Sequence, residues 1–171
     1  MPNSSKNIVI GVTGSIAVYK SCELVRMFRR ADIGVDVVMT AAAEEFVTEL
    51  TFRTLSCNPV CRGLFDEPLE WNPMHITANV IAKMANGIAD DSLTALALAN
   101  VKPLFIEPAM NVNMWNHPAT QANLATLRSR GATLLEPGVG ELACGTTGKG
   151  RMLDPQEIFD AVMAAMAWEL A

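Results

Sequence analysis

Several features that the sequence lacks narrow its class before any motif is considered. No apolar run approaches the roughly 20 residues that a membrane-spanning helix needs. Beyond Arg29 and Arg30 there is no block of basic residues, and the net charge of −5 argues against a nucleic-acid partner. Residues 1–7 are polar and lead directly into an apolar run, unlike a secretory signal peptide. We expect a cytoplasmic protein without a membrane or nucleic-acid partner.

Cysteines and aromatic residues are also scarce. The sequence has four cysteines, and 6% of its residues are aromatic. Cys57 and Cys61 lie four positions apart, but no second pair and no group of histidines completes a zinc site. We therefore predict no metal and free thiols, which are structural except for Cys144.

Aliphatic residues, in contrast, are abundant. Half of the 171 residues are apolar, and ten of them are methionine. Either contacts between subunits cover part of this apolar surface, or an ordinary core lies under an alanine-rich shell of helices. The length favours a single domain over residues 1–171.

Short β-branched runs alternate with segments of helical composition. The predicted strands are 7–12, 35–39, 104–106 and 133–135. The predicted helices are 16–30, an alanine-rich stretch after Thr40 with Phe46 and Leu50 on one side, 51–56, 77–100 with an interruption at Gly87, 118–130, and a last helix that Asp154 caps before Pro155. Residues 57–74 are predicted to be a long connection, and 138–150, with five glycines, a loop. This order indicates a doubly wound α/β fold, a parallel sheet with helices on both faces.

The first motif that can carry chemistry is the turn after the first predicted strand, Gly11-Val12-Thr13-Gly14-Ser15-Ile16-Ala17. Glycines permit a tight turn, and the start of the following helix presents free N–H groups to an anion. The spacing matches neither the dinucleotide fingerprint nor the P-loop, so it suits a single phosphate and hence a mononucleotide. The alternative is a plain strand-to-helix turn. Thr40, which ends the second strand, is either a further hydroxyl at this site or a helix cap.

The sequence has two histidines. His75 ends the proline-rich connection, and imidazole is the side chain best suited to proton transfer near neutral pH. His75 is therefore a candidate base, with a surface or capping residue as the alternative. His117, before Pro118, is predicted to be a turn residue that precedes a helix.

Two further motifs follow. Asn111 lies between Met110 and Met114 after a predicted strand, where α/β folds bind ligands; it is either a polar group in an apolar cleft or part of ordinary packing. Cys144 lies in a glycine-rich segment that can close over a substrate, and this places it in an exposed and mobile setting. Lys149 and Arg151 of the same segment are candidate contacts to an anionic substrate, or they are simply solvated.

Together, these motifs resemble the family of homo-oligomeric flavin-containing cysteine decarboxylases. The resemblance spans nearly the whole chain. It rests on GVTGSIAVYK at 11–20, His75-Ile76, Thr77-Ala78-Asn79 leading into Gly-Ile-Ala-Asp-Asp at 87–91, Pro108-Ala109-Met110-Asn111, and Ala143-Cys144-Gly145 with Gly150-Arg151-Met152, in that order. The last motif is most similar to bacterial phosphopantothenoylcysteine decarboxylases, which form the N-terminal half of a bifunctional coenzyme A enzyme.

The resemblance implies a flavodoxin-like fold, FMN between protomers with its phosphate on the Gly14 turn, and a homotrimer that can form a dodecamer. It implies that His75 is the base, that Asn111 binds the substrate carboxylate and that Cys144 donates a proton late in the cycle. The residues expected to contact FMN are Gly14, Ser15, Ile16, Thr40, Thr77 and Asn79, and those expected to contact the substrate are Asn111, Met114, Lys149 and Arg151.

The implied reaction converts 4′-phosphopantothenoylcysteine, a thiol with a phosphate and a carboxylate, to 4′-phosphopantetheine. Loss of CO2 from the cysteine α-carbon would leave an unstabilised carbanion, so an electron sink is needed. Flavin oxidation of the CH2–SH end to a thioaldehyde provides this sink; CO2 is then lost and the hydride returns. An amide such as Asn111 holds the carboxylate without a full countercharge, which would stabilise the ground state.

The sequence departs from the family pattern between Ile76 and Thr77. The family has a further stretch there, with a short helix and a hydrophobic strand that ends in Ala-Pro-Ala. The expected sheet therefore lacks one central strand, and with it one wall of the FMN site. An incomplete sequence is the preferred explanation over a natural deletion, and the intact mass of the expressed protein distinguishes them. The chain also ends without a synthetase half, so we expect a stand-alone decarboxylase or an excised domain, with a fused or separate phosphopantothenate-cysteine ligase as partner.

Three other functions stay open on the sequence. A peptidyl-cysteine decarboxylase shares His75 and the Asn111 motif, and the residues after Cys144 should distinguish it. A flavin prenyltransferase has the same fold but lacks the Asn111 motif and the cysteine loop. A flavin-fold regulatory subunit that binds a phosphatase tends to carry an acidic tail and altered catalytic residues, and this sequence shows neither.

Overall fold

The computed structural model describes residues 6–63, 74–142 and 145–168, and for 74–76 and 167–168 it describes the backbone only. Parallel strands form one six-stranded sheet in the order β3-β2-β1-β4-β5-β6. The strands are β1 (Asn7–Val12), β2 (Gly34–Met39), β3 (Val60–Cys61), β4 (Met74–Ile76), β5 (Phe105–Pro108) and β6 (Thr133–Leu134). The helices are α1 (Val18–Arg30), α2 (Ala41–Glu44), α3 (Glu49–Ser56), α4 (Ala78–Ala85), α5 (Ser92–Ala99), α6 (Val112–Asn116), α7 (Pro118–Ser129) and α8 (Pro155–Trp168).

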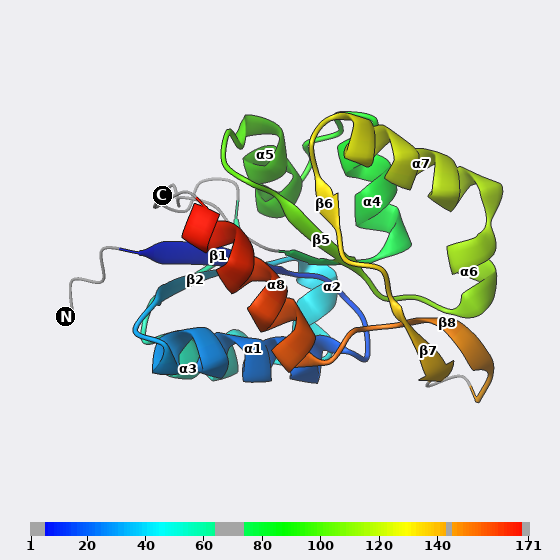
Figure 1. Cartoon of the computed structure of the whole chain (residues 1–171). Coiled ribbons are helices and arrows are strands. Elements are labelled where there is room, and N and C mark those ends of the chain that lie inside the picture. Colours follow the sequence, from blue (N-terminus) through cyan, green and yellow to red (C-terminus); the bar gives the residue numbers. More distant parts are fainter. Residues whose placement is uncertain (1–5, 64–73, 143–144, 169–171) are drawn as a thin grey trace.

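Helices cover both faces of this sheet, which confirms the doubly wound class. Helices α1, α3 and α8 lie on one face, and α4, α5 and α7 on the other (Figure 1). Side chains alternate between the two layers because successive residues of a strand point to opposite faces. In β1, Ile8 and Ile10 belong to the core under α1 and α8, whereas Val9 belongs to the core under α4 and α7.

The helix boundaries follow the local chemistry of the chain. Gly87 adopts a φ of +68° and separates α4 from α5, as the sequence predicts. Asp91 then begins α5 with a capping box, in which its carboxylate accepts from the backbone N–H of Thr94 at 2.8 Å. At α8, the predicted cap is confirmed, because Asp154 Oδ1 accepts from the backbone N–H of Gln156 at 3.1 Å. His117 caps α7 through Nδ1, which accepts from Ala119 N at 3.2 Å.

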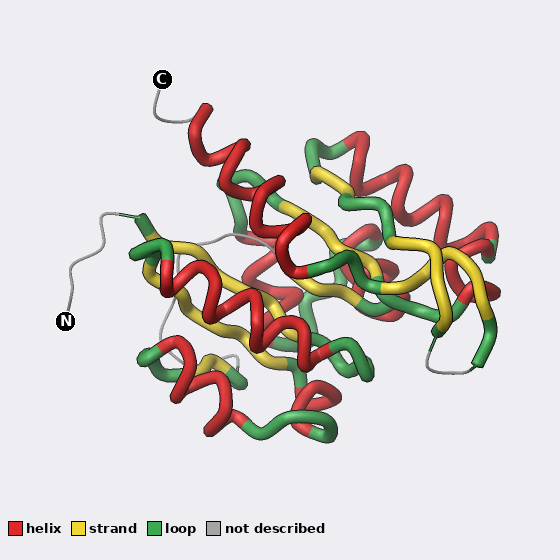
Figure 2. Tube along the Cα trace, turned by 60° about the horizontal axis from the view of Figure 1, so that its bottom comes forward, coloured by secondary structure: helices red, strands yellow, loops and turns green. Residues whose placement is uncertain are grey.

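Local predictions differ from the structure at several places. Residues 57–74, predicted to be a connection, contain β3 and the first residue of β4, and the short helix α6 was not predicted. The alanine-rich stretch after Thr40 forms only the four-residue α2, because the chain turns again and Thr48 occupies the N-cap position of α3. Residues 138–150, predicted to be a loop, contain the antiparallel pair β7 (Gly138–Glu141) and β8 (Thr147–Arg151). This hairpin lies beyond the end of the main sheet (Figure 2). Its glycines indicate a loop by composition, but each strand is extended by pairing with the other.

The expected vacancy in the middle of the sheet is absent. Residues 74–76 form β4, which lies between β1 and β5 and pairs in register with both. These three residues pair with β5 at three positions, Met74 with Ile106, His75 with Glu107 and Ile76 with Pro108, and with β1 at Gly11. His75 therefore lies within the central strand, opposite Glu107 of β5. The sheet is continuous although the chain passes directly from Ile76 to Thr77.

The strand order also determines where a ligand can bind. The chain proceeds from β1 to β2 and β3 on one side, and then returns to β4 on the other side of β1. Such a reversal leaves a crevice at the carboxyl ends of the two adjacent strands, β1 and β4. Across the described ranges, no helix has the length and apolarity needed to span a bilayer.

Candidate active site

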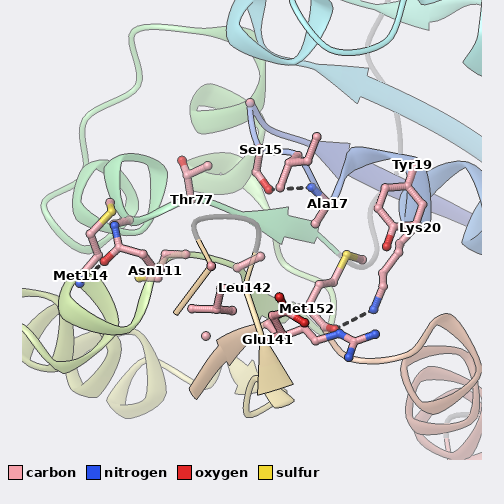
Figure 3. Close-up of a pocket in the computed structure, with 18 residues that line it drawn as sticks. Ser15, Ala17, Tyr19, Lys20, Thr77, Asn111, Met114, Glu141, Leu142 and Met152 are labelled. Atoms are coloured by element: carbon pink, nitrogen blue, oxygen red, sulfur yellow. Dashed lines mark hydrogen bonds between the residues drawn. The ribbon is translucent and has the colours of Figure 1, made fainter. Parts of the chain in front are cut away.

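A cavity of about 790 Å³ lies at this switch point. Four segments line it: the turn after β1 with the first residues of α1, the residues after β4, the residues after β5, and the β7–β8 hairpin with its exit (Figure 3). The backbone N–H of Thr77 donates to the buried Thr13 hydroxyl at 3.1 Å, and this bond joins the segments that follow β1 and β4. The four motifs that the sequence singled out thus lie around one cavity or next to it.

The turn after β1 has the chemistry of a phosphate site. Ser15 Oγ accepts from the backbone N–H of Ala17 at 3.1 Å, which shapes the turn. Within the described residues, the backbone N–H groups of Ser15 and Ile16 have no protein acceptor, and the first turn of α1 holds no acidic residue. A thirteen-residue helix directs its partial positive charge to this point. The residues present therefore fit an anionic phosphate group.

Gly14 is needed at this turn for a packing reason. A Cβ atom added at Gly14 would lie 2.6 Å from the Cβ and the carbonyl oxygen of Ala42. Only a residue without a side chain lets the turn approach the start of α2 so closely. Thr40 precedes α2 as its N-cap residue, and its hydroxyl lies 3.5 Å from the carbonyl oxygen of Val12. Thr40 is buried and lies outside the cavity lining.

Asn111 lies on the opposite wall, at the start of α6. Its Oδ1 accepts from the backbone N–H of Met114 at 2.9 Å, so Asn111 caps this short helix. With the oxygen held in this way, the Nδ2 amino group is the end of the amide that stays available to a ligand. An amide N–H pair can donate to both oxygens of a carboxylate. Asn111 and Met114 both line the cavity, as the sequence predicts (Figure 3).

The hairpin closes the cavity by packing against the loop that contains Asn111. The backbone N–H of Met110 donates to the carbonyl oxygen of Gly150 at 3.0 Å. Gly150 has a φ of +141°, and an added Cβ would collide with the carbonyl oxygen of Met110. A Cβ at Gly148 would lie 2.8 Å from a methyl group of Val112. Gly148 and Gly150 let the backbone of β8 approach the loop that contains Asn111. The sequence did not indicate this role, because a glycine-rich segment suggests a flexible loop.

Not every predicted site residue contributes to this lining. Gly14, Ser15, Ile16, Thr77, Asn111, Met114 and Arg151 line the cavity. Asn79 is exposed on α4 and lies outside the lining. Lys149 also lies outside it: its Nζ is 2.6 Å from Glu136 Oε2 and 5.3 Å from the centroid of the Trp115 ring. The side chain of His75 and the whole of Cys144 lie outside the described residues, so their predicted roles stay predictions.

The structure adds two residues that sequence reasoning missed, Tyr19 and Lys20 of α1. Both line the cavity (Figure 3). Lys20 is only 6% exposed, and its Nζ donates to the carbonyl oxygens of Met152 at 2.8 Å and Leu153 at 3.1 Å. Burial lowers the pKa of Lys20, and the nearby Arg151 lowers it further. A lysine in the first turn of an amphipathic helix is normally predicted to be a surface residue. The only sequence signal for Tyr19 and Lys20 was that they belong to the motif GVTGSIAVYK.

A doubly wound α/β protein whose switch-point cavity is lined by a turn with free N–H groups and by an asparagine is, by class, a nucleotide-type cofactor protein. Comparison with known proteins gives the family: the chain belongs to the Flavoprotein family, whose model matches residues 1–167.

Similar sequences have one name in common. The coenzyme A biosynthesis bifunctional protein CoaBC of Haemophilus influenzae is 43% identical over 176 residues, which cover 95% of this chain and 44% of that protein. The CoaBC protein of Bacillus subtilis is 43% identical over 169 residues, 91% of this chain and 42% of that protein. The chain thus spans less than half the length of these curated relatives.

Similar solved structures agree in fold. A PPC decarboxylase in complex with pantothenoylaminoethenethiol superposes with a TM-score of 0.81 at 28% identity, over 96% of this chain and 98% of the other. The FMN binding protein AtHal3 superposes with a TM-score of 0.78 at 28% identity, over 97% and 98% of the two chains. The FMN-dependent cysteine decarboxylase SpaF gives 0.77 at 26% identity, over 95% and 98%.

Proposed function

We propose that this chain is an FMN-dependent decarboxylase that converts 4′-phosphopantothenoylcysteine to 4′-phosphopantetheine in coenzyme A biosynthesis. The observation that carries the proposal is a cavity lined both by the turn after β1, which fits a phosphate, and by Asn111. The similarity to CoaBC proteins over at least nine-tenths of the chain and to a PPC decarboxylase over nearly the whole of both chains supports the substrate.

The chain holds FMN through its phosphate and its cavity walls. The unpaired N–H groups of Ser15 and Ile16 donate to the phosphate, aided by the helix dipole of α1. Thr77, at the end of β4, provides a further polar wall. FMN bound there would supply the electron sink that CO2 loss needs, through reversible hydride transfer with the CH2–SH end of the substrate. Thr40 and Asn79 are predicted contacts that do not line the cavity of one chain.

Asn111 binds the carboxylate that is lost. Its Nδ2 group donates to the carboxylate while the cap to Met114 N holds the amide plane. A neutral donor suits this role, because a cation would stabilise the charged reactant more than the transition state for CO2 loss. His75 accepts the proton released as the thiol end is oxidised, and Cys144 returns a proton to the carbon that loses CO2. Both roles rest on the family resemblance.

The protein acts as a homo-oligomer, either a trimer or a dodecamer built from trimers. Apolar side chains stay exposed next to the cavity: Ile16 and Tyr19 are each 60% exposed, and Val139 is 74% exposed. Large apolar side chains that stay exposed beside a binding site are typical of contacts between subunits. FMN bound at this edge would then lie where a second chain can cover it. The oligomer lies in the cytoplasm, whose reducing conditions keep the thiol substrate and the cysteines from forming disulfides.

A partner activity follows from the same relatives. The CoaBC proteins are named bifunctional and are more than twice the length of the segment they share with this chain. We place the complementary activity, a phosphopantothenate-cysteine ligase, in a fused or a separate domain that supplies the carboxylated thiol.

The experiment that tests the function uses purified protein, 4′-phosphopantothenoylcysteine and a peptide with a C-terminal cysteine. We expect a yellow protein with an FMN spectrum that releases CO2 from the first compound and forms 4′-phosphopantetheine. Turnover of the peptide alone would assign a peptidyl-cysteine decarboxylase instead. A folded protein that binds FMN and releases CO2 from neither would favour a regulatory subunit or a prenyltransferase. A folded protein that takes up no FMN would contradict the cofactor.

A further inference from the structure

The segment at the exit of the hairpin, Gly150 to Leu153, is held at four backbone positions. Met110 N donates to Gly150 O at 3.0 Å, and Lys20 Nζ donates to the carbonyl oxygens of Met152 and Leu153. The backbone N–H of Leu153 in turn donates to Glu107 Oε1 at 3.0 Å. A short segment at the edge of a cavity is thereby fastened to α1 and to β5.

Lys20 and Glu107 are charged, yet they are only 6% and 3% exposed. Burying an ammonium and a carboxylate costs free energy unless their hydrogen bonds are satisfied. Here the side chains of both residues form hydrogen bonds with the backbone of the segment from Gly150 to Leu153. A hydrophobic side chain could fill either space without that cost. We infer that the two charged residues are present because the position of this segment has to be fixed.

Arg151 is the charged residue of this segment that lines the cavity. Arg151 lines the cavity, and among the described residues it makes no ion pair. A Cβ atom added at Gly140 would lie 3.3 Å from Arg151 Nη1, so the bare backbone of β7 leaves room for the guanidinium. Lys149, two residues earlier on β8, differs: it pairs with Glu136. Of the two cations on this strand, Arg151 is the one available to an anionic ligand.

We propose that Lys20 is a positioning residue, which holds the exit of β8 so that Arg151 receives the phosphate end of the substrate. The proposal rests on the function proposed above, since it assigns a role to the phosphate of 4′-phosphopantothenoylcysteine. A guanidinium suits a phosphate because it donates two parallel hydrogen bonds, but only when its backbone is placed correctly. In this proposal Lys20 acts through the backbone of the segment, since two of its three donors are engaged with the carbonyl oxygens of Met152 and Leu153.

The test compares the binding of 4′-phosphopantetheine and pantetheine to the FMN-loaded protein by calorimetry. A charge-assisted bond to Arg151 should favour the phosphorylated compound by about ten-fold or more. Arg151→Met should reduce this ratio of dissociation constants to near one. Lys149→Met, which removes the same charge from the same strand, should leave the ratio unchanged because Lys149 is engaged with Glu136.

Lys20→Met should reduce the ratio as Arg151→Met does, and Lys20→Arg, which keeps the donors, should restore most of it. In the Arg151→Met background, Lys20→Met should have no further effect on the ratio, because Lys20 acts through Arg151. If Lys20→Met does not fold, Lys20→Gln, which removes the charge and one of the three N–H donors and shortens the side chain, takes its place. Lys102→Met controls for the loss of an exposed lysine away from the cavity.

A second measurement does not depend on any ligand. Amide hydrogen exchange at Leu153 should accelerate in Lys20→Met and stay unchanged in Lys102→Met, because the first change frees the segment that Glu107 also holds. A ratio that survives Lys20→Met, or losses that add in the double variant, would overturn the proposal. Unchanged exchange at Leu153 would do so as well. If the wild-type protein binds neither compound, the proposed function and the phosphate role of Arg151 fail, and exchange at Leu153 alone decides the positioning role.

Discussion

Asn111→Asp separates the two roles that the structure gives to this side chain. Aspartate keeps an oxygen that accepts from Met114 N, and it caps helices as well as asparagine does. The free energy of unfolding should therefore change by less than about 0.5 kcal/mol. The amino group that faces the ligand is lost, however, and a negative charge takes its place.

The expected loss of activity can be worked out from these parts. A hydrogen bond to a charged group contributes about 1.5–3 kcal/mol, and two carboxylates about 4 Å apart repel by about 4 kcal/mol at an effective dielectric constant of 20. Together these terms amount to about 5.5–7 kcal/mol, and because each 1.4 kcal/mol is about a factor of ten, kcat/KM for 4′-phosphopantothenoylcysteine should fall by about 10⁴-fold or more. The assay measures CO2 release together with thermal unfolding and FMN content.

Asn111→Ala provides the matched comparison. It removes the donor and the cap together, so it should lose activity and also about 1 kcal/mol of stability. An Asn111→Asp protein with wild-type kcat/KM would refute the carboxylate role. An Asn111→Asp protein that loses as much stability as Asn111→Ala would refute the capping argument.

Three further predictions concern stability. Gly150→Ala should lower the free energy of unfolding by more than 1 kcal/mol, because alanine is strained at a φ of +141° and its Cβ would meet a carbonyl oxygen; an unchanged melting temperature would contradict the close contact. Asp91→Ala should cost about 1 kcal/mol in urea unfolding through loss of the capping box of α5, whereas Asp91→Asn should cost less. Hydrogen bonding to Lys149 lowers the pKa of Glu136 from its usual value of 4.5, so its stabilisation is present above that pH and is lost as the pH falls through the lowered pKa. Since the pair is exposed, Glu136→Gln should cost less than about 1 kcal/mol at neutral pH and nothing at pH 2, and salt should weaken the effect.

Local patterns of the sequence were enough for the elements that depend on neighbouring residues. The strand at 7–12, the cap at Asp154 and the turn at His117 before a helix are where the sequence predicts them, since apolar alternation and helix-start signals act over a few residues. The β7–β8 hairpin was missed for the opposite reason. Strands such as Gly-Val-Gly-Glu have little β-propensity of their own, and they form through their mutual pairing and their contact with α6.

The candidate site shows the same division. Asn111 and the turn at Gly14 and Ser15 could be predicted, because their position after a strand already indicates a ligand. Lys20 could not, because nothing in a helix sequence tells which lysine is buried. Lys149 and Arg151 also have the same pattern in sequence, and only the placement of Glu136 distinguishes the paired cation from the available one.

The sequence alone therefore determined the class of fold, the position of the turn after β1 and the family, since these depend on short-range patterns and on motifs in a given order. Tertiary structure decided what the chain does at its centre and its edge: it placed residues 74–76 as the strand between β1 and β5, and it brought Lys20 and Glu107 onto the backbone of one segment 46 to 133 residues away. The physical reason is that burial and hydrogen-bond satisfaction are properties of the whole packed molecule. Strand edges and buried charged groups form hydrogen bonds with whatever groups the fold places next to them. The sequence separation between the two partners does not determine which pairs form.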